Sequence, residues 1–342
     1  MAAPLRIGIF GLGRIGRNLL RILYRRPDVE IAAIADLADP KPLEYLLRFD
    51  TVLGRFPDAV SLENGRLSLL GRSIPAITGK AQPEVPDWGG LGVETVFEST
   101  SRGRTRAELE RHLMAGDRRV IALAPPLEAP DITCVMGLND GDLKAEHRIV
   151  SNASSTVHCL APLAKILDDA FGIRRALFTT VHSYTSHQRL ADVPAKEMRL
   201  GRAAAENIIP QASRSPSMVM ELLPRLRGKV TGAALSVPVR NGSLVDLVCW
   251  HDSAVTPAAV NEAVRSAATS ERWNRFLSFE DNPIVSSDVA LSRFSGIFDS
   301  LATMTIAGNV SKTLCWFDSG FGYAHRAVDL LERFAGLETG AP

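Results

Sequence analysis

The sequence is poor in cysteine, has almost no excess charge of either sign and lacks a long apolar run. Its four cysteines stand apart and form no Cys-x-x-Cys pair, which excludes a disulfide framework and leaves no metal site to expect. The 39 lysines and arginines nearly balance the 38 aspartates and glutamates, for a net charge of +1. Neither nucleic acid nor an anionic membrane is therefore an expected partner. No apolar stretch reaches the roughly 18 residues of a membrane helix, and the N-terminus lacks the features of a signal peptide. These absences predict a cytoplasmic protein.

What is present is typical of a globular chain. Hydrophobic residues make up 46% and charged residues 23% of the 342 residues, a balance unlike that of disordered proteins. At about 150 residues per domain, this length predicts two domains.

Short apolar runs alternate with amphipathic stretches in the first half of the chain. The predicted elements are strands over residues 6–10, 30–35, 95–98 and 119–123, and helices over residues 14–25, 41–49 and 105–115. Strands separated by helices of this length predict a mostly parallel sheet. Residues 61–81 differ, because they hold short polar pieces around Asn64-Gly65 and Gly71, which predicts a small antiparallel excursion.

After residue 151 the pattern changes to long strands with few helices between them. The predicted elements are a helix over residues 154–171, strands over residues 176–184, 229–237, 243–250 and 302–317, and a last helix over residues 323–334. Such a pattern predicts an antiparallel sheet backed by helices. The polar tail, residues 336–342, is expected to be loose.

A glycine-rich turn lies between the first predicted strand and the first predicted helix. Residues 11–16 read Gly-Leu-Gly-Arg-Ile-Gly and fit GxGxxG, and Asp36 follows Gly16 by 20 positions at the end of the next strand. The glycines let the backbone approach a pyrophosphate at the helix N-terminus. Asp36 would accept hydrogen bonds from ribose hydroxyls and repel a 2′-phosphate, which favours NAD over NADP. The alternative is a strand–helix turn that binds nothing.

Two further stretches hold groups suited to covalent or acid–base chemistry. Residues 151–162 open a helix, whose N-terminus would stabilise the negative charge of a nucleophile placed there. Residues 179–185 place His182 near the end of a strand. His182 suits a general base, and equally a buried, hydrogen-bonded histidine.

Nine stretches of the chain carry a specific resemblance: GIFGLGRIGR, DLADP, VMGLND, SNASSTVHCLAP, TTVHSYTSHQ, RAAAENIIPQ, GKVTGAALSVP, VSSD and GFGYAHR. In this order they make the chain similar to the phosphorylating glyceraldehyde-3-phosphate dehydrogenases along nearly its full length. The resemblance implies an α/β fold with a doubly wound parallel Rossmann sheet that binds NAD in residues 1–150 and is completed by a C-terminal helix, residues 323–335. It further implies an α+β catalytic domain, an antiparallel sheet plus helices, over residues 151–318, and a homotetramer.

The family's reaction is covalent. A cysteine thiolate attacks the aldehyde, the thiohemiacetal passes a hydride to NAD, and phosphate cleaves the thioester, while a histidine raises the thiolate population. His182 matches that histidine, and Ser155 stands at the nucleophile's position. The positions that match the cofactor site are Gly11, Gly13, Arg14, Ile15, Gly16, Asp36, Ser99, Thr100 and Ser319. Those assigned to substrate or anion binding are Ser154, Thr156, Thr185, His187, Ser213, Arg214 and Ser236.

The nucleophile is the first departure from the family pattern. Ser155 replaces the cysteine of SNASC, and a serine hydroxyl ionises far less near neutral pH than a thiol, whose free pKa is about 8.5. His182 can in principle activate Ser155, as histidine does in serine hydrolases, but the sequence identifies no acidic partner for it. Cys159 lies one helical turn further in and is expected to face the core.

Phosphate recognition is the second departure. Ser236 replaces the arginine of the family's ALRVP, and the RRAR segment loses another arginine, so two charge-assisted contacts worth about 1.5–3 kcal/mol each are absent. His187 replaces the aspartate of HxYTxDQ, and residues 213–217 replace the Thr-Gly of STGAAK. Arg214, Arg240 and His187 are new basic groups, which are either plain surface charges or a rebuilt anion site for a different acid or phosphorylated substrate.

The nicotinamide end of the cofactor site is the third departure. Ser319 replaces the asparagine that would hold the carboxamide, Ser101 replaces the glycine of ESTG, and Phe10 replaces an asparagine just before Gly11. Because the pyrophosphate loop and Asp36 remain, NAD binding is expected to survive.

These observations leave several hypotheses open. The favoured one is an NAD-dependent oxidoreductase that acts on a sugar-phosphate-like or other small anionic aldehyde, with altered nucleophile and phosphate sites. In a second, Ser155 is an engineered replacement in an active dehydrogenase. In a third, the protein is a non-catalytic NAD-binding pseudoenzyme. A redox reaction without a covalent intermediate, in which His182 handles the proton and Ser155 only hydrogen-bonds, completes the set.

Overall fold

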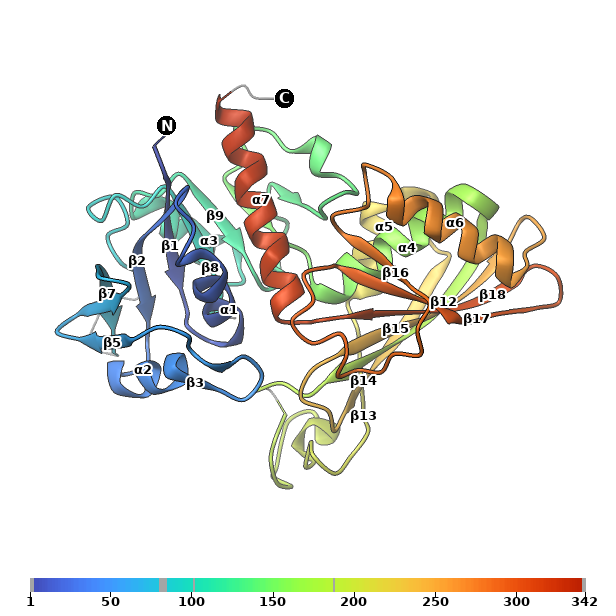
Figure 1. Cartoon of the computed structure of the whole chain (residues 1–342), viewed down its shortest axis with the longest axis horizontal. Helices are drawn as coiled ribbons and strands as arrows, with labels where there is room; N and C mark the ends of the chain where they lie inside the picture. Colours follow the sequence, from blue (N-terminus) through green and yellow to red (C-terminus); the bar gives the residue numbers. More distant parts are fainter. Residues whose placement is uncertain (1–2, 80–84, 101, 187, 340–342) are drawn as a thin grey trace. The chain divides into compact units, whose positions relative to one another are not determined.

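The computed structural model describes residues 3–79, 85–100, 102–186 and 188–339 (Figure 1). The chain divides into two compact units, Met1–Ala153 together with Ala324–Pro342, and Ser154–Tyr323. Each unit is built on its own sheet. Within the described residues, no helix combines the length and the hydropathy needed to cross a membrane.

A nine-stranded sheet in the order β10-β11-β9-β8-β1-β2-β7-β6-β5 forms the first unit. All neighbours from β10 to β7 run parallel. The strands are β1 (Leu5–Phe10), β2 (Val29–Asp36), β5 (Val60–Glu63), β6 (Arg66–Leu69), β7 (Arg72–Thr78), β8 (Thr95–Glu98), β9 (Arg119–Ala122), β10 (Ile132–Thr133) and β11 (Ile149–Ser151), beside a separate pair, β3 (Phe49–Asp50) and β4 (Gly54–Arg55). Strands β8 and β9 are buried at every residue, as in parallel sheets covered on both faces. This confirms the predicted doubly wound sheet.

Helices flank this sheet. They are α1 (Arg14–Leu23), α2 (Pro40–Arg48), α3 (Arg106–Met114), the 3-10 turn η1 (Asp140–Asp142) and α7 (Phe321–Thr339). A reciprocal capping box between Thr105 and Glu108 starts α3. The later part of α7 belongs to this unit, where Glu332 pairs with Arg26 and the guanidinium of Arg119 lies 3.7 Å from the centroid of the Phe334 ring. The C-terminal helix therefore joins the first unit.

The antiparallel excursion after α2 is also present. Strands β5, β6 and β7 pair antiparallel through two tight turns. Asn64 and Gly65 form one turn and Leu70 and Gly71 the other, all with φ between +51° and +73°, as in the primed turns that match strand twist. The prediction is confirmed up to residue 79; residues 80 and 81 lie outside the described part.

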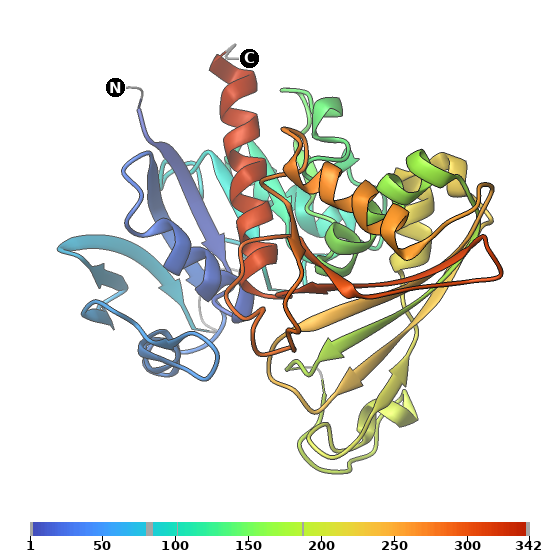
Figure 2. The same cartoon turned by 45° about the vertical axis from the view of Figure 1, so that its right-hand side comes forward.

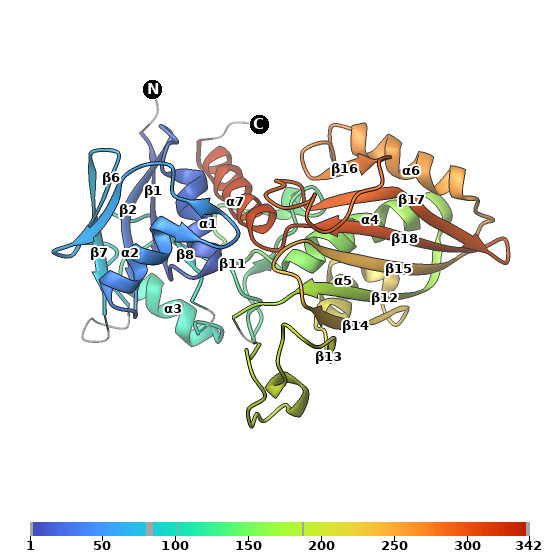
Figure 3. The ribbon, with the colours of Figure 1, turned by 60° about the horizontal axis from the view of Figure 1, so that its bottom comes forward.

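A seven-stranded sheet in the order β13-β14-β12-β15-β18-β17-β16 forms the second unit. Its strands are β12 (Ile173–Ser183), β13 (Ile209–Gln211), β14 (Val230–Val237), β15 (Ser243–His251), β16 (Leu277–Glu280), β17 (Gly296–Ile306) and β18 (Val310–Phe317). Its helices are α4 (Ser155–Phe171), α5 (Ser215–Leu222), α6 (Pro257–Thr269), η2 (Met198–Gly201) and η3 (Pro224–Leu226). Helices α4, α5 and α6 lie on one face of the sheet (Figures 2 and 3). Most strands accordingly alternate between buried and more exposed residues.

Three predictions about this half of the chain were wrong. Residues 302–317 are the end of β17 and all of β18, joined by a turn in which Ala307 and Gly308 have positive φ; the alternation of apolar and polar residues continues through the turn and hides it. The sheet is mixed, because β12–β14 and β16–β17 pair parallel. Residues 336–339 of the expected loose tail continue α7, while residues 340–342 lie outside the described part.

Candidate functional site

The glycine loop between β1 and α1 has the geometry that a bound dinucleotide needs. Gly11 has φ +98°, and a Cβ placed on it would come within 2.9 Å of the Thr100 amide nitrogen. A Cβ on Gly16 would come within 1.9 Å of the Gly11 carbonyl oxygen. Gly13 is exposed and faces open space. The first and third glycines therefore allow close packing, and the second leaves the backbone accessible to a ligand.

The N-terminus of α1 gives this loop a partial positive charge, which attracts an anionic ligand. Gly13 caps the helix without a side-chain hydrogen bond, and Arg14 and Ile15 are its first residues. Unpaired amide groups at a helix start favour the negative charge of a pyrophosphate. The residues present thus fit NAD at this position.

Asp36, at the end of β2, accepts a hydrogen bond from the backbone of the glycine loop. Its carboxylate accepts hydrogen bonds from the Leu12 amide at 2.6 Å and from the Ala38 amide at 2.8 Å. Each bond uses a different oxygen, so both oxygens keep acceptor capacity for ribose hydroxyls.

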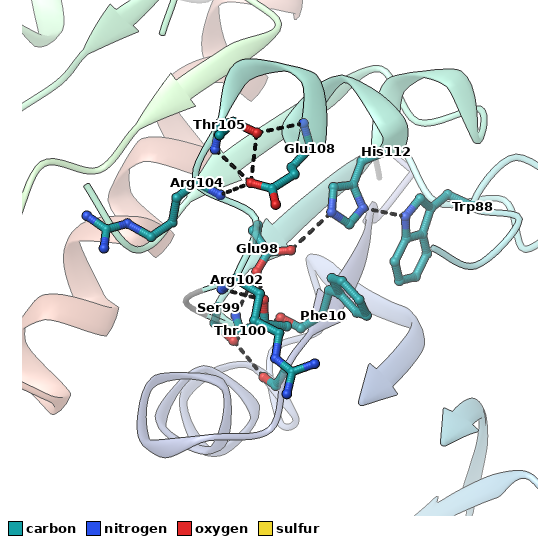
Figure 4. Close-up of polar contacts among 11 residues, drawn as sticks. Phe10, Trp88, Glu98, Ser99, Thr100, Arg102, Arg104, Thr105, Glu108 and His112 are labelled. Carbon is teal, nitrogen blue, oxygen red and sulfur yellow. Dashed lines mark hydrogen bonds and ion pairs between the residues drawn. The ribbon is translucent and has the colours of Figure 1, made fainter. Parts of the chain in front are cut away.

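The turn after β8 lies against the same loop (Figure 4). Ser99 Oγ donates to the Gly11 carbonyl oxygen at 2.6 Å. Thr100 donates from its amide and its hydroxyl to Glu98 Oε1, at 2.7 and 2.5 Å. The structure thereby brings Gly11, Ser99 and Thr100 together within the first unit. Phe10, the departure just before the loop, is buried and packs edge-on against His112 at 5.1 Å between ring centroids.

In the second unit, the predicted nucleophile opens α4. Ser154 is the N-cap and its hydroxyl accepts from the Val157 amide at 3.3 Å. Ser155 is the first helical residue and is partly buried, while Thr156 is buried. The position at a helix N-terminus favours negative charge on a bound group. The assignment of Ser155 as nucleophile stays a prediction.

His182 lies near the end of β12 between two threonine hydroxyls. Its Nε2 is 3.2 Å from Thr156 Oγ1 and 3.3 Å from Thr180 Oγ1, and its ring meets Phe317 edge-on. Burial lowers the pKa of His182 to about 4, so the ring is neutral at pH 7. Among the described residues, no hydrogen bond joins His182 to Ser155. Thr180 was not singled out from the sequence, although its place two residues earlier on a strand puts it on the same face.

Ser236, at the position where the resemblance predicts an arginine, is buried among uncharged groups. Its Oγ accepts from Gln211 Nε2 at 2.8 Å and from Gln188 Nε2 at 3.3 Å. Gln188 Oε1 in turn accepts from the amide and hydroxyl of Thr185, at 2.7 and 2.9 Å. Ser236 also pairs with His182 in the β12–β14 register. The structure brings Thr185, Ser236 and His182 together, and the two glutamines are partners that sequence reasoning missed.

The other predicted anion-binding residues lie at the start of α5 or outside the described part. Ser213 Oγ accepts from the Ser215 amide at 3.2 Å, and Arg214 is exposed just before α5. His187 lies outside the described residues, as does Ser101. Ser319 is partly buried in the second unit, within a turn whose Asp318 carboxylate accepts from the amides of Gly320 and Phe321, each at 2.7 Å.

The four cysteines do not offer a replacement nucleophile. All are free and buried. Burial raises the pKa of the Cys159 thiol well above its usual range, and the Cys159 Sγ lies 3.6 Å from the Cys315 carbonyl oxygen. Thiols in such surroundings are inert.

Comparison with known proteins covers almost the whole chain. Residues 5–106 match the family model described as "Glyceraldehyde 3-phosphate dehydrogenase, NAD binding domain", and residues 154–319 match "Glyceraldehyde 3-phosphate dehydrogenase, C-terminal domain". Glyceraldehyde-3-phosphate dehydrogenase of Geobacillus stearothermophilus is 44% identical over 327 residues, which are 95% of this chain and 96% of that protein. Glyceraldehyde-3-phosphate dehydrogenase 1 of Bacillus subtilis is 43% identical over 326 residues, with the same coverage. The Streptomyces coelicolor glyceraldehyde-3-phosphate dehydrogenase is 42% identical over 328 residues, 95% of this chain and 97% of its own length.

Proposed function

Because the chain belongs to the glyceraldehyde-3-phosphate dehydrogenase family, we propose that it oxidises an aldehyde with NAD as cofactor, in the cytoplasm, through an altered nucleophile and an altered phosphate site. The observation that carries this proposal is the intact glycine loop at residues 11–16, where Gly11 and Gly16 meet backbone atoms too closely for any other residue. The family match over both units supplies the reaction class.

The side chains of the second unit define what the protein contributes to the chemistry. Bound NAD supplies the hydride acceptor. In a covalent route, Ser155 Oγ bonds to the carbonyl carbon and its proton passes to the neutral imidazole of His182. Loss of the hydride leaves an ester, which phosphate or water cleaves to restore the serine hydroxyl. This route needs Ser155 to move within hydrogen-bond distance of His182.

In a route without a covalent intermediate, Ser155 does not need to act as a nucleophile. The hydrated aldehyde loses a hydroxyl proton to His182 and a hydride to the cofactor, and Ser155 only donates a hydrogen bond. The low pKa of His182 makes the ring a weak base in either route. We therefore expect turnover well below the typical enzyme value of about 10 per second.

One observation favours a second candidate, a non-catalytic NAD-binding protein. In the described part of the chain, the hydrogen bonds of His182 Nε2 go to Thr156 and Thr180 and none goes to Ser155. A protein that only binds NAD would not need a hydrogen bond between Ser155 and His182.

A homotetramer belongs to the same proposal. Large apolar side chains are exposed on the sheet and on the segment between β12 and β13 of the second unit. They are Leu177, Leu190, Met198, Ile208, Leu301, Met304 and Ile306. An exposed apolar surface of this kind is typical of contacts between subunits. Light scattering on the purified protein measures the mass directly.

The deciding experiment is a screen of aldehydes and sugar phosphates that follows NADH, run on the wild-type protein and on Ser155→Cys. We expect slow oxidation of a small aldehyde by the wild-type protein and faster oxidation by Ser155→Cys. NAD binding with no NADH from either protein would instead support the non-catalytic candidate.

A further inference from the structure

A buried chain of hydrogen bonds joins Trp88, His112 and Glu98, and Glu98 comes just before the turn at Ser99 and Thr100 (Figure 4). Trp88 Nε1 lies 2.9 Å from His112 Nδ1, and His112 Nε2 lies 3.0 Å from Glu98 Oε2. Trp88, His112 and Glu98 have exposed fractions of 0%, 1% and 2%. Nothing in the proposed chemistry uses these three side chains. A carboxylate buried this deeply needs well-placed donors to offset its desolvation.

The indole of Trp88 determines which ring nitrogen of His112 carries the proton. An indole N–H only donates, so His112 Nδ1 accepts and carries no proton. The ring proton is therefore on Nε2, from which it is donated to Glu98 Oε2. A proton on Nδ1 would point at the indole N–H, so the contact with Trp88 favours the Nε2–H form of His112.

The other oxygen of Glu98 holds the turn that touches the glycine loop. Oε1 accepts from both the amide and the hydroxyl of Thr100, and the Thr100 hydroxyl accepts in turn from the Arg102 amide at 3.2 Å. The neighbouring Ser99 hydroxyl donates to the Gly11 carbonyl oxygen. The position of Gly11 is thus tied to the carboxylate of Glu98.

Phe10 closes the cluster from the side of β1. Its ring lies edge-on to both His112 and Trp88, with centroids 5.1 and 6.2 Å away. An apolar cover of this kind strengthens the hydrogen bonds beneath it and makes the loss of one more costly.

We propose that Glu98 is a positioning residue for the cofactor: held by His112 and Trp88, it fixes Thr100 and the glycine loop in the shape that NAD binds. Glu98 does not itself touch the cofactor. The inference rests on the NAD-dependent function proposed above, but concerns binding alone and is tested without turnover.

The test begins with Glu98→Gln and calorimetric titration of NAD. The amide has one oxygen, whereas both His112 and Thr100 must donate to residue 98, so one donor would face an N–H group. We expect NAD affinity to fall about tenfold or more. Glu108→Gln is the matched control, because Glu108 Oε2 also accepts from two amides and a threonine hydroxyl, yet lies in the cap of α3. Its NAD affinity should stay within about twofold of the wild-type value.

A second substitution separates positioning from mere stability. In Trp88→Phe/Glu98→Gln the indole donor is gone, so His112 is free to carry its proton on Nδ1 and to accept from the side-chain amide at position 98, which leaves the amide oxygen for Thr100. We expect this double variant to bind NAD more tightly than Glu98→Gln alone. Wild-type affinity in Glu98→Gln, or no recovery in the double variant, would overturn the proposal.

Nitrogen NMR of the wild-type protein gives a readout that needs no variant to fold. We expect the spectrum to show a proton on Nε2 of His112 and none on Nδ1, because Nδ1 accepts from the indole. A proton on Nδ1 would refute the hydrogen-bond chain. Loss of NAD affinity in Glu98→Gln together with no aldehyde oxidation by the wild-type protein would leave the positioning role standing and reject the dehydrogenase function.

Discussion

The imidazole of His182 lies against the hydroxyl of Thr156, with 3.2 Å between Nε2 and Oγ1. The two residues come from β12 and from the first turn of α4. The candidate base therefore contacts the residue that directly follows the candidate nucleophile, Ser155. The covalent route therefore needs the start of α4 to bring Ser155 Oγ within hydrogen-bond distance of His182.

Replacing Ser155 by cysteine should raise aldehyde oxidation by about 100-fold or more, because a thiolate at a helix N-terminus is a far better nucleophile than a serine hydroxyl. The same variant should take up one equivalent of a thiol reagent in the native state, since the four natural cysteines are buried. Kinetics and mass spectrometry measure the two effects. Ser155→Ala is the control, and an unchanged rate in Ser155→Cys would leave only the hypotheses in which residue 155 is no nucleophile.

The pH dependence of activity should follow the neutral form of His182. Since burial lowers the pKa of His182 to about 4, the base is available above that pH, and the rate should not change through the usual histidine range near pH 6.5. Activity should fall only as the pH approaches 4. A titration of kcat/KM with an inflection near 6.5 would show that His182 is not the base, or that it is more exposed in the working enzyme.

Asp117 should make the protein less stable as the pH rises. It is 3% exposed, neither of its oxygens has a hydrogen-bond partner in the described part of the chain, and burial raises its pKa to about 7. The folded pKa thus exceeds the unfolded value of about 3.9. The folded state binds the extra proton, and its stabilisation is fully present below pH 4 and is lost as the pH rises through 7.

Asp117→Asn should therefore be more stable than the wild-type protein at pH 8, by about 1–3 kcal/mol, and the advantage should shrink at pH 5. Thermal unfolding at the two pH values measures it. Asp142→Asn, at an exposed aspartate, is the control. Equal shifts in both variants at both pH values would mean that Asp117 titrates normally.

Asp36 should decide between NAD and NADP. Asp36→Asn keeps an oxygen for the Leu12 amide but removes the charge that repels a 2′-phosphate. We expect wild-type protein to bind NAD at least about tenfold more tightly than NADP and the variant to lose most of this preference. Titration of both dinucleotides tests this, and tighter NADP binding by the wild-type protein would contradict the role of Asp36.

Features formed by residues close together in the sequence, such as strands, turns and helix caps, could be predicted. Contacts between residues far apart in the sequence could not. The glycine loop, Asp36 at the end of β2 and the start of α4 follow from short-range patterns of strand, turn and cap. The turn at Gly308 was missed because apolar and polar residues alternate through it, from the end of β17 into β18.

The hydrogen-bond partners around the candidate sites lay beyond sequence patterns. Trp88 and His112 are 24 residues apart and meet only when α3 packs on the sheet. Ser236 and Gln188 are 48 residues apart and meet because β12 and β14 pair in parallel. Hydrogen bonds of this kind depend on tertiary packing, which no local periodicity encodes.

The burial of all four thiols protects them from oxidation. Hydrogen peroxide converts accessible thiolates to sulfenic acid, and a low pKa and solvent access make a cysteine vulnerable. Here burial raises the pKa of Cys134, Cys159 and Cys249, and a hydroxyl occupies the position at the head of α4. A chain built this way keeps its candidate site chemically intact under oxidants that would disable a thiol-dependent enzyme.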